Sequence, residues 1–159
     1  MILREERAGE AGAVEALVMR AFAPMPFADG NDHTIPERLR AAGDLVLGLV
    51  AVDAGRIVGQ ASFSAASVGG APRWVCLGPI AVEPGWQRQG IGRALIAEGL
   101  ARLSDRPGCV LLGNPAVYGG SGFASGDVTW RDVSREYVMK RVLAGPDAEG
   151  EVAFAPAFG

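Results

Sequence analysis

The chain has 159 residues, of which 49% are hydrophobic and 21% charged. This length fits one domain, residues 1–159, with a buried core, and the composition excludes a wholly disordered chain. The formal net charge of −3 offers no general attraction to nucleic acid or to an anionic membrane, but it allows a local anion site and leaves room for a homodimer.

The N-terminal part predicts one strand and two helices. Residues 1–4 form a short strand, and apolar residues recur at helical spacing from 10 to 23 until Pro24 and Pro26 end the helix. Thr34, with Glu37 three residues later, has the form of a capping box before a second helix over 35–42.

The rest of the chain predicts a mixed sheet crossed by one long helix. Apolar runs between turn signals indicate strands, the first three forming an antiparallel meander. The strands lie over 45–52, 56–67, 73–82, 109–112, 137–143 and 152–154, and the helices over 90–104 and within 114–122. The strand–helix–strand succession around the long helix implies a parallel pair, so the predicted fold class is α/β with a mixed sheet.

The first residues of the chain and its few cysteine and histidine residues bear on where the protein is located and on whether it binds a metal. The first seven residues lack the apolar stretch of a signal peptide, and no window is apolar enough to span a membrane, so we expect a cytoplasmic protein. Cys76 and Cys109 each lie in an apolar run, which predicts two buried, reduced thiols. With His33 as the lone histidine, they supply no metal-ligand cluster, and we expect no metal.

A glycine-rich turn before the long helix predicts an anion site. Backbone N–H groups at a helix N-terminus lack helical partners, and the helix dipole favours negative charge there. Gly90 and Gly92 allow a phosphate to approach the backbone, and Arg88 and Arg93 add positive charge. The alternative is a plain helix start with exposed arginines.

Two common phosphate ligands do not match this turn. Leu95 stands where a dinucleotide fingerprint needs its third glycine, and no acidic residue ends a strand about 20 residues later. The Gly-Lys-Ser/Thr of a Walker A loop is missing as well. NAD and ATP are therefore disfavoured, which leaves another pyrophosphate carrier.

The turn and its flanks resemble the GNAT superfamily of acyl-CoA-dependent N-acetyltransferases. Gln87-x-x-Gly90-x-Gly92 is similar to the superfamily's pyrophosphate loop, and residues 77–84 are similar to the strand before it. Residues 112–123, which include Tyr118 and end in Gly-Phe, resemble the segment after its fifth strand. Short matches at 33–34, 39–40, 150–154 and 157–158 resemble one bacterial branch of predicted N-acetyltransferases.

The chain departs from that branch at two places near Tyr118. Val117 stands where the branch often has a second tyrosine, and the following Gly119-Gly120-Ser121 is weak as a helix. The rigidity of the short helix that carries Tyr118 is therefore open at this point.

The resemblance implies acetyl-CoA as co-substrate and a mostly antiparallel sheet whose parallel fourth and fifth strands splay apart at the cofactor. Pro79 has no N–H and agrees with a broken ladder at that point, although a simple strand edge is the alternative. The cofactor-binding residues so implied are Ile80, Ala81, Val82, Gln87, Arg88, Gln89, Gly90, Ile91, Gly92, Arg93 and Asn114. Asn114 is equally explained as a turn residue before Pro115.

The resemblance also implies that an amine attacks the thioester directly in a ternary complex. A backbone N–H near Val82 would stabilise the oxyanion, and Tyr118 matches the general-acid position, with a packing role as the alternative. The strand carboxylate that many members use as base is missing. Candidate bases are Glu83, His33, Asp29 and Asp32, while a water chain or an already neutral amine needs none.

The amine acceptor would lie against residues 24–33 and the C-terminal strands. Met25, Phe27 and Trp130 can line its site, and Asp29 and Asp32 can attract a cation, but the apolar residues equally suit core or a dimer contact. A small metabolite, an antibiotic and a protein amine stay open as acceptors.

Two other functions also stay open: an acyl-CoA-binding regulatory or sensor module without transfer, and an unrelated α/β nucleotide-binding enzyme.

Overall fold

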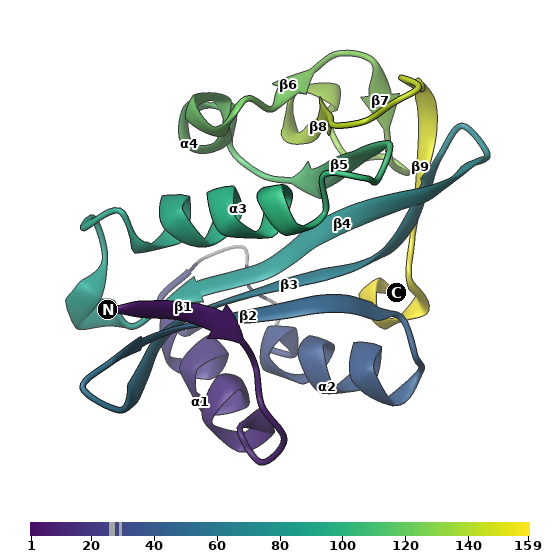
Figure 1. Ribbon diagram of the computed structural model, residues 1–159. Helices are drawn as coiled ribbons and strands as arrows, with labels where there is room; N and C mark the ends of the chain where they lie inside the picture. The colour runs from purple at the N-terminus through teal and green to yellow at the C-terminus, as the bar shows by residue number, and fades with distance from the viewer. Residues whose placement is uncertain (26–27, 29) are drawn as a thin grey trace.

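Figure 1 shows the computed structural model of the chain, which describes all residues except 26, 27 and 29. The strands are β1 (Ile2–Glu5), β2 (Leu45–Asp53), β3 (Arg56–Val68), β4 (Ala71–Val82), β5 (Gly108–Leu112), β6 (Ala124–Ser125), β7 (Val128–Thr129), β8 (Val138–Val142) and β9 (Gly150–Phe154). The helices are α1 (Ala11–Phe22), α2 (Ile35–Ala41), α3 (Ile91–Arg102) and α4 (Pro115–Tyr118). Short 3-10 turns are η1 (Asp32–Thr34), η2 (Pro84–Trp86), η3 (Gly119–Ser121), η4 (Arg135–Tyr137) and η5 (Pro156–Phe158).

The strands form a mixed sheet of nine within the residues that are described, in the order β1-β2-β3-β4-β5-β8-β6, with β9 pairing β3 and β7. The β4–β5 and β7–β9 pairs are parallel, and the other pairs are antiparallel. The predicted mixed α/β fold with a parallel β4–β5 pair is therefore confirmed.

Helices cover both faces of the central strands: α3 lies on one face, and α1 and α2 lie on the other (Figure 1). The α3 side holds the largest buried cluster, which includes Phe63, Leu95 and Leu111. Val14, Leu17, Val18 and Ala21 of α1 pack on Val50 and Ala81. Both clusters follow from the helical spacing of apolar residues, which puts them on one side of each helix.

A glycine brings α3 close to the sheet. A Cβ at Gly99 would lie 2.2 Å from the ring of Phe63, so any side chain there would push the helix and the ring apart. The ring packs directly on the helix backbone, and this close approach fixes the height of α3 above β3 and β4.

The predicted capping box at Thr34 is wrong. Thr34 has helical φ and ψ of −85° and −15° because η1 continues directly into α2, and its side chain makes no capping hydrogen bond. The hydroxyl of Thr34 donates to the carbonyl of Asn31 at 2.7 Å, and Glu37 forms an ion pair with Arg40. A capping side chain needs an extended N-cap residue, which this junction does not have.

The two cysteines are buried and not bonded to each other, as predicted. Burial raises the pKa of the Cys76 thiol to about 12 and also raises that of Cys109. Neither thiol therefore has the character of a reactive thiolate. In the described part of the chain no helix is long and apolar enough to cross a membrane.

Candidate functional site

Strand β4 parts from β5 halfway along its length. The two strands pair only at Val75 with Cys109 and at Cys76 with Val110 among the residues described, whereas β3 follows β4 as far as Val82. The β3–β4 register has a bulge at the point of separation, where Gly78 and Pro79 stand opposite a single residue of β3. The strands therefore separate where Pro79 predicted a broken ladder.

Beyond the bulge, the amides of Ile80 and Val82 face away from β3. The Glu83 amide donates to the Val58 carbonyl at 2.8 Å. Since hydrogen-bonded and non-bonded pairs alternate along an antiparallel ladder, Val82 and Ile80 are non-bonded positions. Their N–H groups point to the edge that β5 has left, which gives that edge two donors for a ligand.

Ala81 lies between these two residues and is oriented differently. Its place in the alternation turns its backbone groups toward Gln60 on β3, its cross-strand partner. Its side chain packs beneath α1 with Val50. Of the predicted β4 contacts, Ile80 and Val82 thus offer amides, while Ala81 supports the strand from the opposite side.

The N-terminus of α3 opens beside the same part of β4. Gly90 has a left-handed φ of 84°, and the first helical hydrogen bond runs from the Ala94 amide to the Gly90 carbonyl at 3.0 Å. The preceding amides, those of residues 90–93, donate to no acceptor in the described part of the chain. A Cβ at Gly92 would lie 3.9 Å from the side chains of both Ile80 and Val82, so the helix mouth and the open edge of β4 are contiguous.

The side chains of the turn differ in what they do. The Gln87 side-chain amide donates to the Val82 carbonyl at 3.2 Å, which ties the turn to the end of β4. Arg88, with a left-handed φ of 64°, and Gln89 are exposed. Ile91 is buried in the core beneath α3, so only its amide faces the mouth. This set of free amides and exposed cations suits a diphosphate.

Arg93 extends from the first turn of α3 toward the segment after Tyr118. A Cβ at Gly120 would lie 3.3 Å from Nη2 of Arg93. The Gly119-Gly120-Ser121 sequence, a departure from the family pattern, thus leaves space that the Arg93 guanidinium fills. The charge of Arg93 lies between the helix mouth and η3.

Tyr118 ends α4 and packs closely on the turn after β5. A Cβ at Gly113 would lie 2.4 Å from the Tyr118 ring, so only glycine fits beneath it. Burial raises the pKa of Tyr118, which keeps the phenol protonated at neutral pH. Its hydroxyl takes part in no hydrogen bond with the residues described, and its side chain is partly buried against the core beneath α3. The ring is held in place while its hydroxyl is available to a ligand.

Asn114 caps the helix that carries Tyr118. Its Oδ1 accepts a hydrogen bond from the Ala116 amide at 2.9 Å, as an N-cap side chain does. The side chain is otherwise exposed at the end of β5, so its amide nitrogen can still meet a ligand. Asn114 is therefore compatible with both predicted roles, a contact to the cofactor and a residue that shapes the turn before Pro115.

Glu83 is held in an ion pair on the α1 side of the sheet. Arg20 of α1 donates through Nε to Oε1 at 3.0 Å and through Nη2 to Oε2 at 2.7 Å, and Arg56 lies 3.4 Å from Oε1. The hydrogen bonds from Arg20 lower the pKa of Glu83. A carboxylate so occupied is a weak proton acceptor, and the geometry favours a structural role for it.

His33 lies at a hollow between the C-terminal end of α1 and η1. The hollow has a volume of about 220 Å³ and is lined by Met19, Phe22, Ala23, Met25, Ala28, Gly30, Asp32 and His33. Met25 and Asp32, predicted to meet the acceptor, are therefore part of it together with His33. Phe27 and Asp29 lie outside the described residues. Arg20, next to Met19 in the chain, binds Glu83 at the end of β4, so the C-terminal half of α1 contacts both the hollow and that end of the strand.

Trp130 belongs to a different cluster. Its ring lies 5.2 Å from that of Phe154, Phe154 lies 5.7 Å from Phe158, and the Arg131 guanidinium lies 4.4 Å above Trp130. These contacts join β9 to the C-terminal turn. Trp130 therefore contacts the C-terminal segment and does not line the hollow beside His33.

The sequence reasoning did not single out three residues near the site: Arg20, Gln60 and Ser62. Arg20 becomes notable only through its contact with Glu83, 63 residues away. Gln60 and Ser62 are buried on the α1 side of β3, and the Gln60 side chain bonds to the bulge of β4. Their alternation with Ala61 and Phe63 is a signal in the sequence, because a polar face on a central strand indicates either solvent or a buried network.

Comparisons with known proteins agree with this geometry. The Acetyltransferase (GNAT) family model matches residues 14–118. The chain is 36% identical over 127 residues to an uncharacterized N-acetyltransferase of Escherichia coli strain K12, YhbS, covering 77% of this chain and 73% of that protein.

Solved structures show the same similarity over almost the whole chain. A GNAT family acetyltransferase from Brucella melitensis in complex with acetyl-CoA has a TM-score of 0.88 at 35% identity and covers 99% of this chain and 97% of its own. YhbS from Escherichia coli in complex with CoA has a TM-score of 0.89 at 30% identity, with 99% and 91% covered. The chain belongs to the GNAT family of acetyltransferases.

Proposed function

We propose that the protein transfers an acetyl group from acetyl-CoA to an amine by direct attack in a ternary complex. The observation that carries the proposal is the continuous row of unpaired amides, from Ile80 and Val82 on β4 to residues 90–93 at the mouth of α3. A diphosphate fits the helix mouth, and an extended amide-bearing arm fits the strand edge. Two similar structures are complexes with acetyl-CoA and CoA.

In the proposed reaction, the amine nitrogen bonds to the acetyl carbon and the carbon–sulfur bond breaks. The Val82 amide supports the developing oxyanion, because its N–H points to the edge that β5 has left. The departing thiolate, with a pKa of about 8.5, takes a proton from the Tyr118 hydroxyl. The raised pKa of Tyr118 ensures that this proton is present at neutral pH.

The proton that the amine loses does not go to Glu83 in this proposal. Both oxygens of Glu83 are engaged by Arg20, and its lowered pKa makes it a poor base. His33 lies at the hollow beside the end of α1 and is the side-chain candidate that stays. Transfer to water, or an amine that arrives neutral, is the other route.

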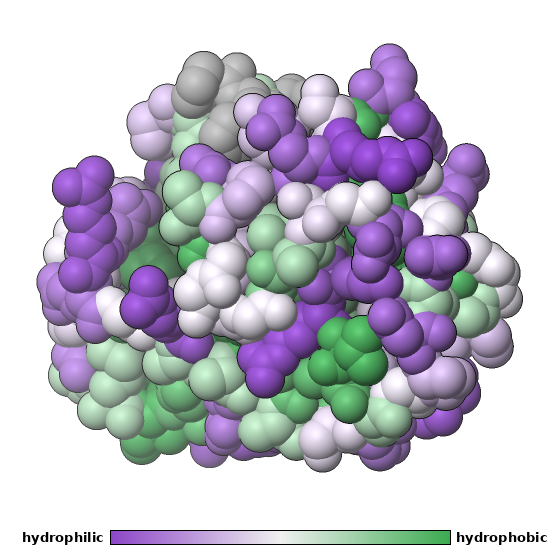
Figure 2. All heavy atoms as spheres, turned by 90° about the horizontal axis from the view of Figure 1, so that it is seen from above, coloured by the Kyte–Doolittle hydropathy of each residue, from purple (hydrophilic) through white to green (hydrophobic). Residues whose placement is uncertain are grey.

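The hollow at His33 is the proposed place for the acceptor. It combines apolar walls from Met19 and Phe22 with the carboxylate of Asp32. That chemistry suits an amine carried on an apolar group. A location in the cytoplasm and a homodimer stay predictions. The face that Figure 2 shows carries both hydrophilic and hydrophobic residues.

A binding module that keeps acyl-CoA without transferring it is the second candidate. The observation that favours it is the engagement of Glu83, which leaves no free carboxylate at the end of β4 among the described residues. It predicts the same ligand but no product. The two functions therefore differ in one measurable step, the release of the CoA thiol when an amine is added.

Thermal unfolding with acetyl-CoA, CoA, NAD and ATP tests the binding half of the proposal. A ligand at 100 times its Kd stabilises the folded state by about 2.7 kcal/mol, so CoA and acetyl-CoA should raise Tm while NAD and ATP should not. Thiol release from acetyl-CoA with a panel of amines then tests transfer. Stabilisation without thiol release across the panel would favour the binding module, and no stabilisation would overturn both functions.

A further inference from the structure

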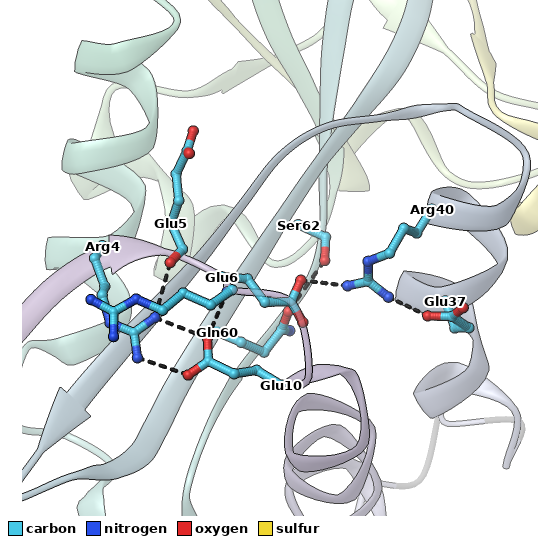
Figure 3. Close-up of polar contacts among 9 residues, drawn as sticks. Arg4, Glu5, Glu6, Glu10, Glu37, Arg40, Gln60 and Ser62 are labelled. Carbon is cyan, nitrogen blue, oxygen red and sulfur yellow. Dashed lines mark hydrogen bonds and ion pairs between the residues drawn. The ribbon is translucent and has the colours of Figure 1, made fainter.

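Gln60 is a polar side chain in a place where the fold has no structural need of one. It lies on the central strand β3, its side chain is 1% exposed, and it faces α1 and α2 (Figure 3). Burying an amide without partners is costly, and an apolar residue would fill the same volume. The partners of this side chain therefore indicate what it does.

Both ends of the Gln60 side chain are hydrogen-bonded. Its Nε2 donates to the Pro79 carbonyl at 2.9 Å, and its Oε1 accepts from the Ser62 hydroxyl at 3.2 Å. A carbonyl can only accept, so the side-chain nitrogen must face Pro79, and the orientation of the amide is fixed. Gln60 thus binds the β4 bulge from the adjacent strand.

The Pro79 carbonyl belongs to the same peptide group as the Ile80 amide. A trans peptide is planar, and its C=O and N–H point in opposite directions. Holding the Pro79 carbonyl toward β3 therefore directs the Ile80 N–H toward the open edge of β4. Pro79 itself has no N–H with which the ladder could hold this peptide.

We infer that Gln60 is a positioning residue for acetyl transfer: its hydrogen bond to Pro79 sets the direction of the Ile80 amide, one of the two amides that meet the thioester arm. This inference rests on the proposed function. It assigns Gln60 no contact with substrate, because α1 and α2 cover it on the opposite face of the sheet. Ser62 holds the side chain of Gln60 in the orientation that donates to Pro79.

The test compares Gln60→Met with Ser64→Ala. Methionine keeps the length and volume of glutamine but cannot donate to Pro79. Ser64 is fully buried four residues further along β3 and is paired with Cys76, where β4 and β5 are still together. Its replacement removes a buried polar group and leaves the bulge untouched.

Steady-state kinetics and CoA titration on folded protein separate positioning from stability. Gln60→Met should lower kcat about 10-fold, because a turned Ile80 amide shifts the thioester arm relative to the attacking amine, and a misplacement of about 1 Å can cost up to 10²-fold. Its CoA affinity should fall only about 2- to 3-fold, since the diphosphate amides at α3 are intact. Ser64→Ala should keep both values. Equal kcat per folded molecule in Gln60→Met and wild type would overturn the inference, even if Tm falls.

Two further arms keep the outcome decisive. If Gln60→Met fails to fold, Ser62→Ala takes its place: a free Gln60 amide should lower kcat about 3-fold at constant CoA affinity, and an unchanged kcat would overturn the inference. If wild type binds CoA but releases no thiol with any amine, the proposed transfer fails. CoA titration of Gln60→Met then decides the positioning role alone, with unchanged affinity counting against it.

Discussion

The mouth of α3 and the face of the sheet beneath α1 and α2 differ in whether their polar groups have hydrogen-bond partners. At the mouth, the amides of residues 90–93, Ile80 and Val82 donate to no described residue, and Arg88 is exposed. Beneath the helices, Glu83 is paired with Arg20, and Gln60 is paired with Pro79 and Ser62. One region is prepared for a ligand, and the other holds the strand that presents it.

The comparison indicates that the negative charge of a ligand is bound at the mouth of α3, whereas the groups beneath α1 and α2 maintain the conformation of β4. Free amides at a helix N-terminus bind an anion without any particular side chain. Buried and mutually paired side chains give shape, because breaking one leaves an unsatisfied group. Changes at the mouth should therefore alter binding, while changes beneath the helices should alter stability or catalytic geometry.

Tyr118→Phe should have the largest effect and tests whether a side chain at the mouth does chemistry. Loss of the hydroxyl removes the proposed proton donor, so turnover should fall roughly 10²-fold or more. CoA affinity should hardly change, because the ring and its packing on Gly113 are kept. Single-turnover thiol release and CoA titration measure the two effects, and unchanged turnover would remove Tyr118 from the mechanism.

A matched pair of glycine variants provides the control for Tyr118. Gly113→Ala forces the ring away, since a Cβ there would lie 2.4 Å from it, whereas a Cβ at Gly119 meets nothing within 4 Å. Gly113→Ala should lower turnover about 10-fold through misplacement of the phenol, and Gly119→Ala should not. Equal activity in the two variants would show that the ring position does not matter.

The two regions also differ in how far the sequence predicts them. The mouth is built from backbone, so Gly90, Gly92 and their spacing from Gln87 already indicate it, and the broken ladder follows from Pro79. The paired face depends on contacts between distant residues: the sequence offers Glu83 as a candidate base because nothing in it indicates that Arg20, 63 residues earlier, reaches this carboxylate.

Local patterns are misleading where tertiary structure changes the backbone. Thr34 has the residue type of a helix cap, but η1 makes it helical before α2 begins. The strands β6 and β7 have two residues each and are set by their pairing with β8 and β9, which no local periodicity reports. Side-chain pairing and short strands are thus the parts that a single sequence leaves open.

Glu83→Gln should have an intermediate effect, on stability and not on the pH dependence of turnover. Losing the ion pair should cost about 1–2 kcal/mol, below the 3–5 kcal/mol of a fully buried pair because Arg20 is 47% exposed. The folded-state pKa of Glu83 is lowered from 4.5. The ion pair of Glu83 therefore contributes fully to the free energy of unfolding above pH 4.5, and this contribution is lost as pH falls through the folded-state pKa.

Denaturant unfolding of wild type and Glu83→Gln across pH checks this prediction. The two free energies of unfolding should differ at neutral pH and converge in acid. Arg56→Gln, which removes only the 3.4 Å contact, is the milder control. A pH–rate profile shifted by Glu83→Gln, with stability unchanged, would return Glu83 to the role of base and end the contrast between the two regions.

Arg88→Gln should have the smallest effect and tests the charge of the mouth apart from its amides. Arg88 is exposed, so its attraction to a diphosphate is screened by water and salt, and Kd for CoA should rise only about 2- to 5-fold. The Kd for CoA should rise with salt concentration in wild type, and it should rise less steeply in Arg88→Gln. Arg102→Gln, at the far end of α3 beside Glu98, should leave Kd unchanged. Since residues 90–93 keep their free amides in both variants, a loss of CoA binding in Arg88→Gln would mean that side-chain charge, and not the backbone, holds the diphosphate.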